Sequence, residues 1–374
     1  MKSVTAHRST YVLVRCGIAV FALLACGCAS VASEVNLDIA EAPQMKGFKL
    51  RVELTDGPPE PGTAVLEQLP FKPYAGGKLK HRLYLPTNWV KGKTYPVLVE
   101  YLGNGGSVDK SGSPMAHGLS GGEEFILVTL PFVEKKLTEV PTGPDAKGRP
   151  QGGMGDVAAT VAYAKAAVPW ICKTWGGDPE RVLLLGFSRG AIACNAIGLH
   201  DDEIAALWRG MVMIDHYDAP GDDAAGFDAE DAKAKRLQRL GMRHQLICGH
   251  MGADESSYDT KVTANYHKEH QKWEEQMKAR NEELIAKAKR YASVPEAIAG
   301  LKLKPCYEID GVTAFVAKYL PRNNITFLPL PYAQHQPGYF LRDIHERQVA
   351  VEWLNKVLTG PRLPPGNVGK DAGQ

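Results

Sequence analysis

The chain has 374 residues, of which 44% are hydrophobic and 23% charged, a balance that suits a globular protein with a sizeable core. Its formal net charge is +2, and Lys2, Arg8 and Arg15 supply three positive charges before the first acid, Glu34. Without those three charges the remainder carries −1, so the composition argues against a nucleic-acid partner.

The first 33 residues have the pattern of an export signal. A basic start is followed by an apolar run, residues 16–25, that is too short to span a bilayer as a helix. Residues 23–27, Leu-Leu-Ala-Cys-Gly, resemble a bacterial lipobox, in which Cys26 would be lipidated and become the mature N-terminus. Cys28 is a second possible lipid site, and cleavage after Ala32 or Ser33 is the competing interpretation. We therefore predict an exported protein, either lipid-anchored in the cell envelope or periplasmic or secreted.

The segments that follow predict one large α/β domain. Residues 34–63 form a polar lead-in whose Pro/Gly-rich end indicates a tether or a turn-rich boundary, and the catalytic domain is expected over 64–360. Apolar runs predict strands, with the first two antiparallel at an edge and the third central: 64–69, 81–85, 95–102, 125–130, 181–185, 210–215, 244–249 and 325–330. Helical spacing predicts a helix capped by Asp156, a segment at 233–240, a charged insertion at about 262–292 and a final helix at 346–358. Residues 361–374 are expected to be a flexible tail.

One short stretch indicates chemistry. Residues 186–190 read Gly-Phe-Ser-Arg-Gly, the G-x-S-x-G pattern, between an apolar strand and a segment of small residues that suits a closely packed helix. A serine on such a tight turn adopts a strained backbone, and glycines two residues either side let neighbouring backbone pass close. Its hydroxyl would stand at a helix N-terminus, where the dipole favours developing negative charge. Ser188 is therefore the predicted nucleophile.

Residues 176–190 resemble the segment leading into the nucleophile elbow of α/β-hydrolase-fold enzymes, particularly secreted esterases and the prolyl-oligopeptidase-like group. The likeness extends more weakly over about residues 64–360. It implies a mostly parallel central sheet with helices on both faces, and acyl transfer through a serine nucleophile.

The resemblance also implies a base and an acid, because the order in this fold is serine, acid, histidine, each at or after the C-terminal end of a strand. His335 lies in the loop directly after the last predicted strand and before the final helix, which makes it the expected general base. Asp254, after the strand at 244–249, is the expected acid. Asp215 and Asp218, after the preceding strand, remain alternatives, as does the neighbouring Glu255.

Two backbone N–H groups are expected to bind the oxyanion. One is that of Arg189, the residue after the nucleophile, and the other is that of Asn104 or Gly105, in the loop after the third strand. The usual histidine of that loop is replaced by Gly103, and a tight glycine turn without function is the alternative. The Arg189 side chain could form a surface salt bridge, or it could reach a substrate carboxylate or the oxyanion.

Other reactive residues give weaker signals. Export permits disulfides, but the pairing is open among Cys172, Cys194, Cys248 and Cys306. Histidines and aspartates at the strand ends lack the helical spacing of a zinc site, so we predict neither a metal nor another cofactor.

These features predict an exported serine hydrolase that cleaves a small-molecule or glycan carboxylic ester. A serine peptidase of the prolyl-oligopeptidase-like group would use the same residues, although such enzymes usually carry a gating domain. A catalytically silent envelope lipoprotein, binding a glycan or a protein through its tryptophans, is the alternative from another class. The substrate and the oligomeric state stay open.

Overall fold

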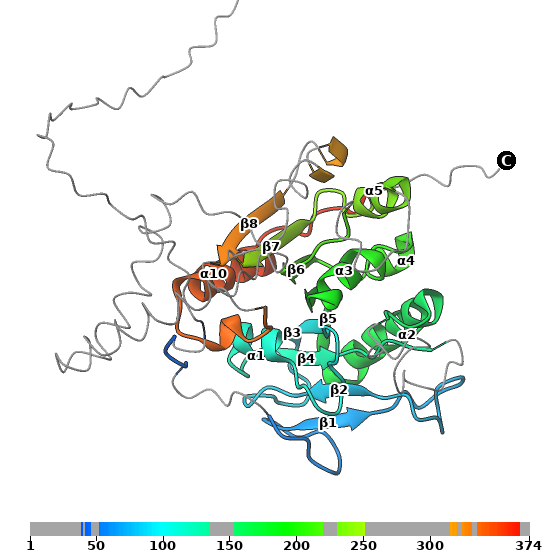
Figure 1. The fold of residues 1–374 in the computed structure, drawn as a ribbon. Helices are drawn as coiled ribbons and strands as arrows, with labels where there is room; N and C mark the ends of the chain where they lie inside the picture. The colour runs from blue at the N-terminus through cyan, green and yellow to red at the C-terminus, as the bar shows by residue number, and fades with distance from the viewer. Residues whose placement is uncertain are drawn as a thin grey trace, which may run out of the picture. The chain divides into compact units, whose positions relative to one another are not determined.

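The apolar runs form an eight-stranded sheet in the order β1-β2-β4-β3-β5-β6-β7-β8 (Figure 1). The computed structural model describes residues 39, 42–45, 52–134, 153–219, 230–250, 315–316, 318–320, 324–330 and 335–366. The chain divides into two compact units, Met1–Glu34 and Val35–Gln374, and the described residues belong to the second. The strands are β1 Ala64–Glu67, β2 His81–Tyr84, β3 Tyr95–Tyr101, β4 Ile126–Thr129, β5 Gly177–Phe187, β6 Gly210–Ile214, β7 His244–His250 and β8 Asn324–Leu330.

Strand directions confirm the expected fold class. β1 pairs antiparallel with β2, and β2 antiparallel with β4, whereas every pairing from β4 through β3 to β8 is parallel. β1 and β8 are the edges of the sheet, and Pro329 lies next to the end of β8, where it is tolerated. A mostly parallel sheet with this crossover order and an antiparallel start is the α/β-hydrolase fold.

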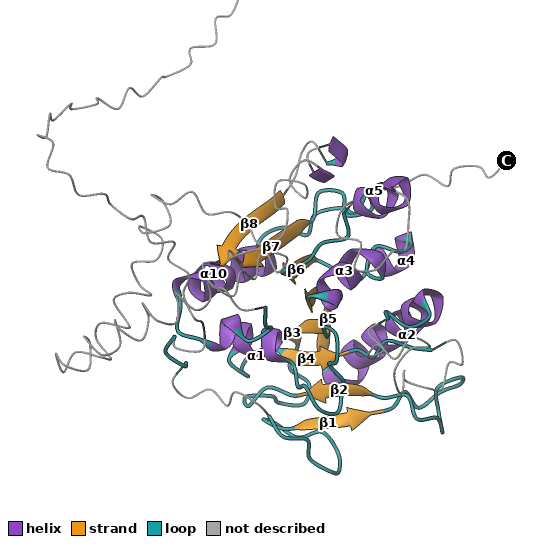
Figure 2. Ribbon diagram, in the orientation of Figure 1, coloured by secondary structure: helices purple, strands orange, loops and turns teal. Residues whose placement is uncertain are grey.

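Helices cover both faces of the sheet (Figure 2). The helices with described bounds are α1 Pro114–Ser120, α2 Val157–Trp175, α3 Arg189–Ala196, α4 Asp202–Ala205, α5 Glu230–Gln238, the 3₁₀ turn η4 Tyr339–Leu341 and α10 His345–Thr359. Alternate residues of β5 enter two separate cores: Val182 and Leu184 pack with α2, α3 and α5, while Leu183 and Leu185 pack with α1 and α10. This alternation follows from the period of two in a strand. No helix in the described residues is long and apolar enough to cross a bilayer.

The described part of the lead-in differs from the expected tether. Ile39 and Ala42 are buried and belong to the core on the α1–α10 face. The backbone N–H of Asp343 donates to the Pro43 carbonyl at 2.7 Å, which joins this segment to the residues just before α10. Two apolar side chains in a polar stretch thus attach the lead-in to the folded body. The leader with Cys26, the segment at 262–292 and residues 367–374 lie outside the described residues.

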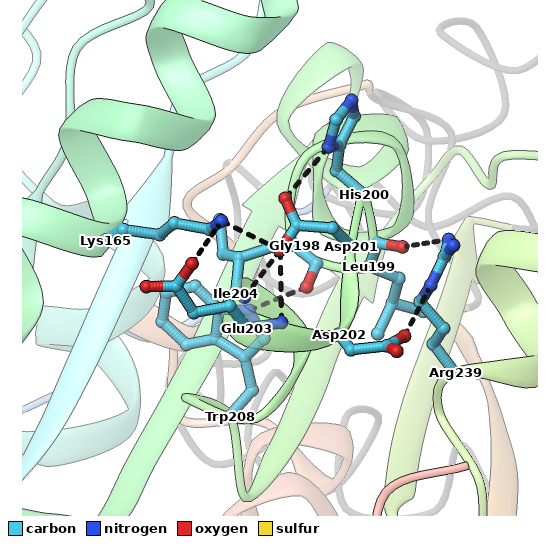
Figure 3. A network of polar contacts seen from close by, with 10 residues as sticks. All are labelled: Lys165, Gly198, Leu199, His200, Asp201, Asp202, Glu203, Ile204, Trp208 and Arg239. Atoms are coloured by element: carbon cyan, nitrogen blue, oxygen red, sulfur yellow. Dashed lines mark hydrogen bonds and ion pairs between the residues drawn. The ribbon is translucent and has the colours of Figure 1, made fainter. Parts of the chain in front are cut away.

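A polar network fixes the loop between α3 and α4 (Figure 3). Asp201 caps α4, since its carboxylate accepts from the backbone N–H groups of Glu203 and Ile204, both at 3.1 Å. Lys165, from α2, lies 2.9 Å from the same carboxylate. Burial alone would raise the pKa of Asp201, but the bonds from Lys165 and Ile204 outweigh it and lower that pKa to about 2.

Replacing Asp201 by Asn therefore makes a pH-dependent difference to stability. The ionised carboxylate stabilises the fold at any pH above its unfolded pKa, near 4, and this contribution is lost as pH falls toward 2. Urea denaturation of wild type and Asp201→Asn should show a deficit in unfolding free energy that is constant at pH 5–7 and shrinks below pH 4. Asp201→Ala, which also removes the cap, should cost about 1 kcal/mol more.

The exposed Asp56, which has no hydrogen bond or ion pair within the described residues, offers the control Asp56→Asn. A deficit for Asp201→Asn that does not change between pH 5 and pH 2.5 would contradict this account.

Candidate active site

Ser188 stands on a strained turn between β5 and α3. Its backbone has φ 54° and ψ −122°, in the left-handed half of the φ range that side chains other than glycine rarely adopt. The Ser188 N–H donates to the Ile214 carbonyl at 2.9 Å, so the turn is attached to the end of β6. The strand–turn–helix context expected from the sequence is therefore present.

Glycines make this turn possible because backbone passes close on both sides. A Cβ on Gly186 would lie 2.0 Å from the Gly190 carbonyl oxygen, and one on Gly190 would lie 1.9 Å from the Tyr101 carbonyl oxygen. Both contacts are with main chain, which cannot move aside as a flexible side chain can. The two glycines thus let α3 approach β3 and hold Ser188 above the carboxyl ends of the parallel strands.

His335 lies among residues that flank the serine and an acid. Its ring centroid is 4.6 Å from that of Phe187, the residue before Ser188, and 5.4 Å from that of His216, which it meets edge to face. Its Nδ1 is 3.1 Å from Oδ2 of Asp215. That separation suits a hydrogen bond, although the approach angle is poorly aligned. Such bonds often tighten only in the substrate complex.

Asp215 is held rigidly at the end of β6. Its backbone has φ 73°, a left-handed conformation in which Asp and Asn are enriched, and its N–H donates to the Cys248 carbonyl at 2.8 Å. Its side chain has no exposed surface, whereas that of His335 is 23% exposed. A buried carboxylate beneath a partly accessible imidazole is the arrangement that an orienting acid needs.

The other candidate acids differ in their placement. Asp218 is bound by Arg236 of α5, with Nε 2.8 Å from Oδ2 and Nη2 3.2 Å from Oδ1, so it anchors a helix. Asp254 and Glu255 lie outside the described residues. Of the acids that the structure describes after β6, Asp215 is the one beside His335.

The loop after β3 forms a β-turn. The Gly106 N–H donates to the Gly103 carbonyl at 3.1 Å, and Gly105 at the third position has φ 72°, where glycine is favoured. Within the described residues, the N–H groups of Asn104 and Gly105 have no acceptor, as the expected oxyanion role requires.

Glu100, in the strand before this loop, is a polar residue that the sequence analysis did not single out. It lies in β3, fully buried, and its Oε2 accepts from the Ala116 N–H of α1 at 3.0 Å. Burial raises the pKa of Glu100 to about 8, and the backbone N–H groups of Ala116 and Met115 only partly oppose the rise. The sequence signal that could have indicated a buried acid was the single glutamate inside the apolar run at 95–102.

The structure describes three of the cysteines and no metal cluster. Cys172, Cys194 and Cys248 are buried free thiols, and Cys306 lies outside the described residues. The described parts of the chain contain no group of three or more His, Cys, Asp or Glu side chains placed to hold a metal ion.

Comparisons with known proteins give structural likeness only. No family model matches the chain, and no curated protein matches its sequence. Esterase 2 of Thermogutta terrifontis, solved after phosphorylation by paraoxon, is 16% identical, with 83% of this chain and 100% of that chain covered and a TM-score of 0.44. An S-formylglutathione hydrolase from Agrobacterium tumefaciens is 12% identical, with coverages of 82% and 100% and a TM-score of 0.45.

A third similar structure is the feruloyl esterase module from Clostridium thermocellum, as an S954A mutant with sinapinate, at 16% identity, coverages of 86% and 98% and a TM-score of 0.43. At these scores the likeness carries no argument about chemistry, which rests on the geometry of this chain.

The buried Glu100 should make the fold less stable as pH rises. Its folded pKa, about 8, lies above its unfolded value near 4.5, so the unfolded chain loses this proton first. Between these values the wild type should lose up to about 1.4 kcal/mol of unfolding free energy per pH unit relative to Glu100→Gln. Urea titrations of both proteins from pH 5 to pH 8 measure this difference, and parallel stability curves would refute it.

Proposed function

We propose that this protein is a serine hydrolase that cleaves a carboxylic ester by acyl transfer. The observation behind the proposal is the 3.1 Å contact of His335 with the buried Asp215, with the imidazole packed on the residue before Ser188. A serine hydroxyl is a weak nucleophile that needs a base, and the base needs a third group to fix its tautomer.

The proposed reaction has two halves. Ser188 Oγ attacks the ester carbonyl carbon while His335 Nε2 takes the hydroxyl proton, and Asp215 holds the Nδ1 proton and stabilises the imidazolium. The N–H groups of Arg189 and of Asn104 or Gly105 bind the oxyanion. Collapse expels the alcohol, which receives the proton from His335. Water then attacks the acyl-enzyme with His335 again as the base, which releases the carboxylic acid and restores Ser188.

Two of the tryptophans that the silent-binder alternative would use, Trp208 and Trp175, have roles within the fold itself. Trp208 is fully buried and donates to the Gly198 carbonyl at 2.9 Å, and Trp175 donates to Glu67 at 3.0 Å. Their indole N–H groups are thus occupied within the fold. Export, lipidation at Cys26 and a membrane association through that lipid stay proposals based on the leader sequence alone.

Fluorophosphonate labelling tests the nucleophile. The reagent phosphonylates an activated serine, so purified wild type should be labelled and Ser188→Ala should not, and hydrolysis of short-chain esters should fall by about 10⁶-fold in the variant. Circular dichroism of Ser188→Ala checks that the fold is kept. Folded wild type that takes no label and cleaves no ester would favour the silent binder.

The identity of the acid is tested by two matched substitutions. Asp215→Asn keeps a residue that accepts the left-handed backbone but presents the wrong tautomer to His335, so kcat should fall by about 10⁴-fold. Asp254→Asn should leave kcat within about threefold of wild type. The reverse pattern, with loss in Asp254→Asn and near-normal turnover in Asp215→Asn, would transfer the role to Asp254.

A further inference from the structure

A cation with no partner in the described part of the chain lies directly after the proposed nucleophile. Arg189 is the first residue of α3, and its side chain is half-buried. Within the described residues its guanidinium forms no hydrogen bond, ion pair or ring contact, so the expected surface salt bridge is not seen there. Arginines that are more deeply buried elsewhere do have partners: Arg236 binds Asp218, and Arg209 donates to the Val357 carbonyl at 2.6 Å.

The position of Arg189 is electrostatically unfavourable in three respects. Burial removes water from the charge and lowers the pKa of the guanidinium, and no carboxylate of the residues that the structure describes offsets this effect. The residue also stands at the N-terminus of a helix, whose dipole repels a cation, and the first turn of α3 contains no acid. An anion bound at the guanidinium would relieve all three.

The chemistry of the side chain indicates which anion fits. A guanidinium presents N–H donors in a planar fork that matches the two oxygens of a carboxylate, and such charge-assisted pairs are among the stronger hydrogen bonds in proteins. Consecutive Cα atoms are about 3.8 Å apart, so the side chain starts beside Ser188. The guanidinium is therefore within reach of a molecule bound at Ser188, and a carboxylate on that molecule is the anion we consider.

We propose that the Arg189 guanidinium binds a carboxylate of the substrate, so that the enzyme selects esters carrying a free carboxylate close to the scissile bond. This inference rests on the proposed ester hydrolysis at Ser188. Arg189 then has two separate roles, because its backbone N–H serves the oxyanion and its side chain serves specificity. The carboxylate can lie on the acyl part or on the alcohol part, and the two sources need separate probes.

Two matched pairs of esters distinguish these sources. Monoethyl succinate and ethyl succinamate differ only in a carboxylate or an amide on the acyl part, and 4-acetoxybenzoate and 4-acetoxybenzamide differ in the same way on the alcohol part. The ratio of kcat/KM within each pair measures the preference for the anion and cancels effects common to both esters. Wild type, Arg189→Gln, Arg189→Lys and the control Lys91→Gln, at an exposed surface lysine, are compared at low ionic strength.

Wild type should prefer the anionic member of at least one pair by about tenfold or more. Arg189→Gln should reduce that preference by about 10- to 100-fold, the range for a hydrogen bond to a charged group. Arg189→Lys should give an intermediate ratio, because it keeps the charge but loses the fork. Lys91→Gln should keep the wild-type ratio. Fluorophosphonate labelling of each variant shows that its site is folded.

Several outcomes would overturn the inference. An unchanged ratio in Arg189→Gln, with labelling and hydrolysis intact, removes the carboxylate site and leaves the ester hydrolase standing. An equal loss on charged and neutral esters would place the guanidinium on the oxyanion instead. Wild type that neither labels nor cleaves any of the four esters would remove the proposed function, and this inference with it.

Discussion

The arrangement of the site depends on how closely α3 approaches the sheet. With Cβ positions only about 2 Å from main-chain oxygens at Gly186 and Gly190, the chain turns from β5 into α3 within a few residues. That turn forces Ser188 into its left-handed conformation and binds its N–H to the end of β6. The same contact sets the serine near the residue that follows β6. One steric condition thus fixes the nucleophile and brings it toward its proposed acid.

The ionisable side chains around this turn differ in how deeply they are buried and in whether they have a partner. Asp215 is completely covered and faces an imidazole, while Glu100, also covered, faces the N-terminus of α1 and has its pKa raised to about 8. Arg189 is only half-covered and has no partner within the described residues. The fully buried acidic groups around this turn are therefore of two kinds. Asp215 has a partner, and Glu100 has a raised pKa that favours its uncharged form at pH 7. The cation at the serine differs, and this contrast is the basis of the specificity we infer.

Much of the sheet was predictable because buried strands have a direct sequence signal. Each apolar run became a strand within a few residues of its expected bounds, although β5 begins at Gly177, earlier than the apolar run that starts at 181. The lead-in was less predictable, since two buried side chains, Ile39 and Ala42, decide its packing. No comparable pattern in the sequence indicates which acid lies beside His335. Asp215 and Asp218 are three residues apart, and what separates them is a left-handed turn at one and Arg236 beside the other.

Burial of the three free cysteines links the stability of the fold to its resistance to oxidation. A cysteine reacts as its thiolate, and burial raises the pKa of Cys172 to about 12 and of Cys194 and Cys248 well above the ordinary range. While the chain is folded, oxidants would find little to attack in this part of the molecule, even in an oxidising compartment. Once opened, the chain would expose all three sulfurs together, and mispaired or over-oxidised forms would be unable to close again. The working lifetime of such a protein would then follow its rate of opening more than its equilibrium stability.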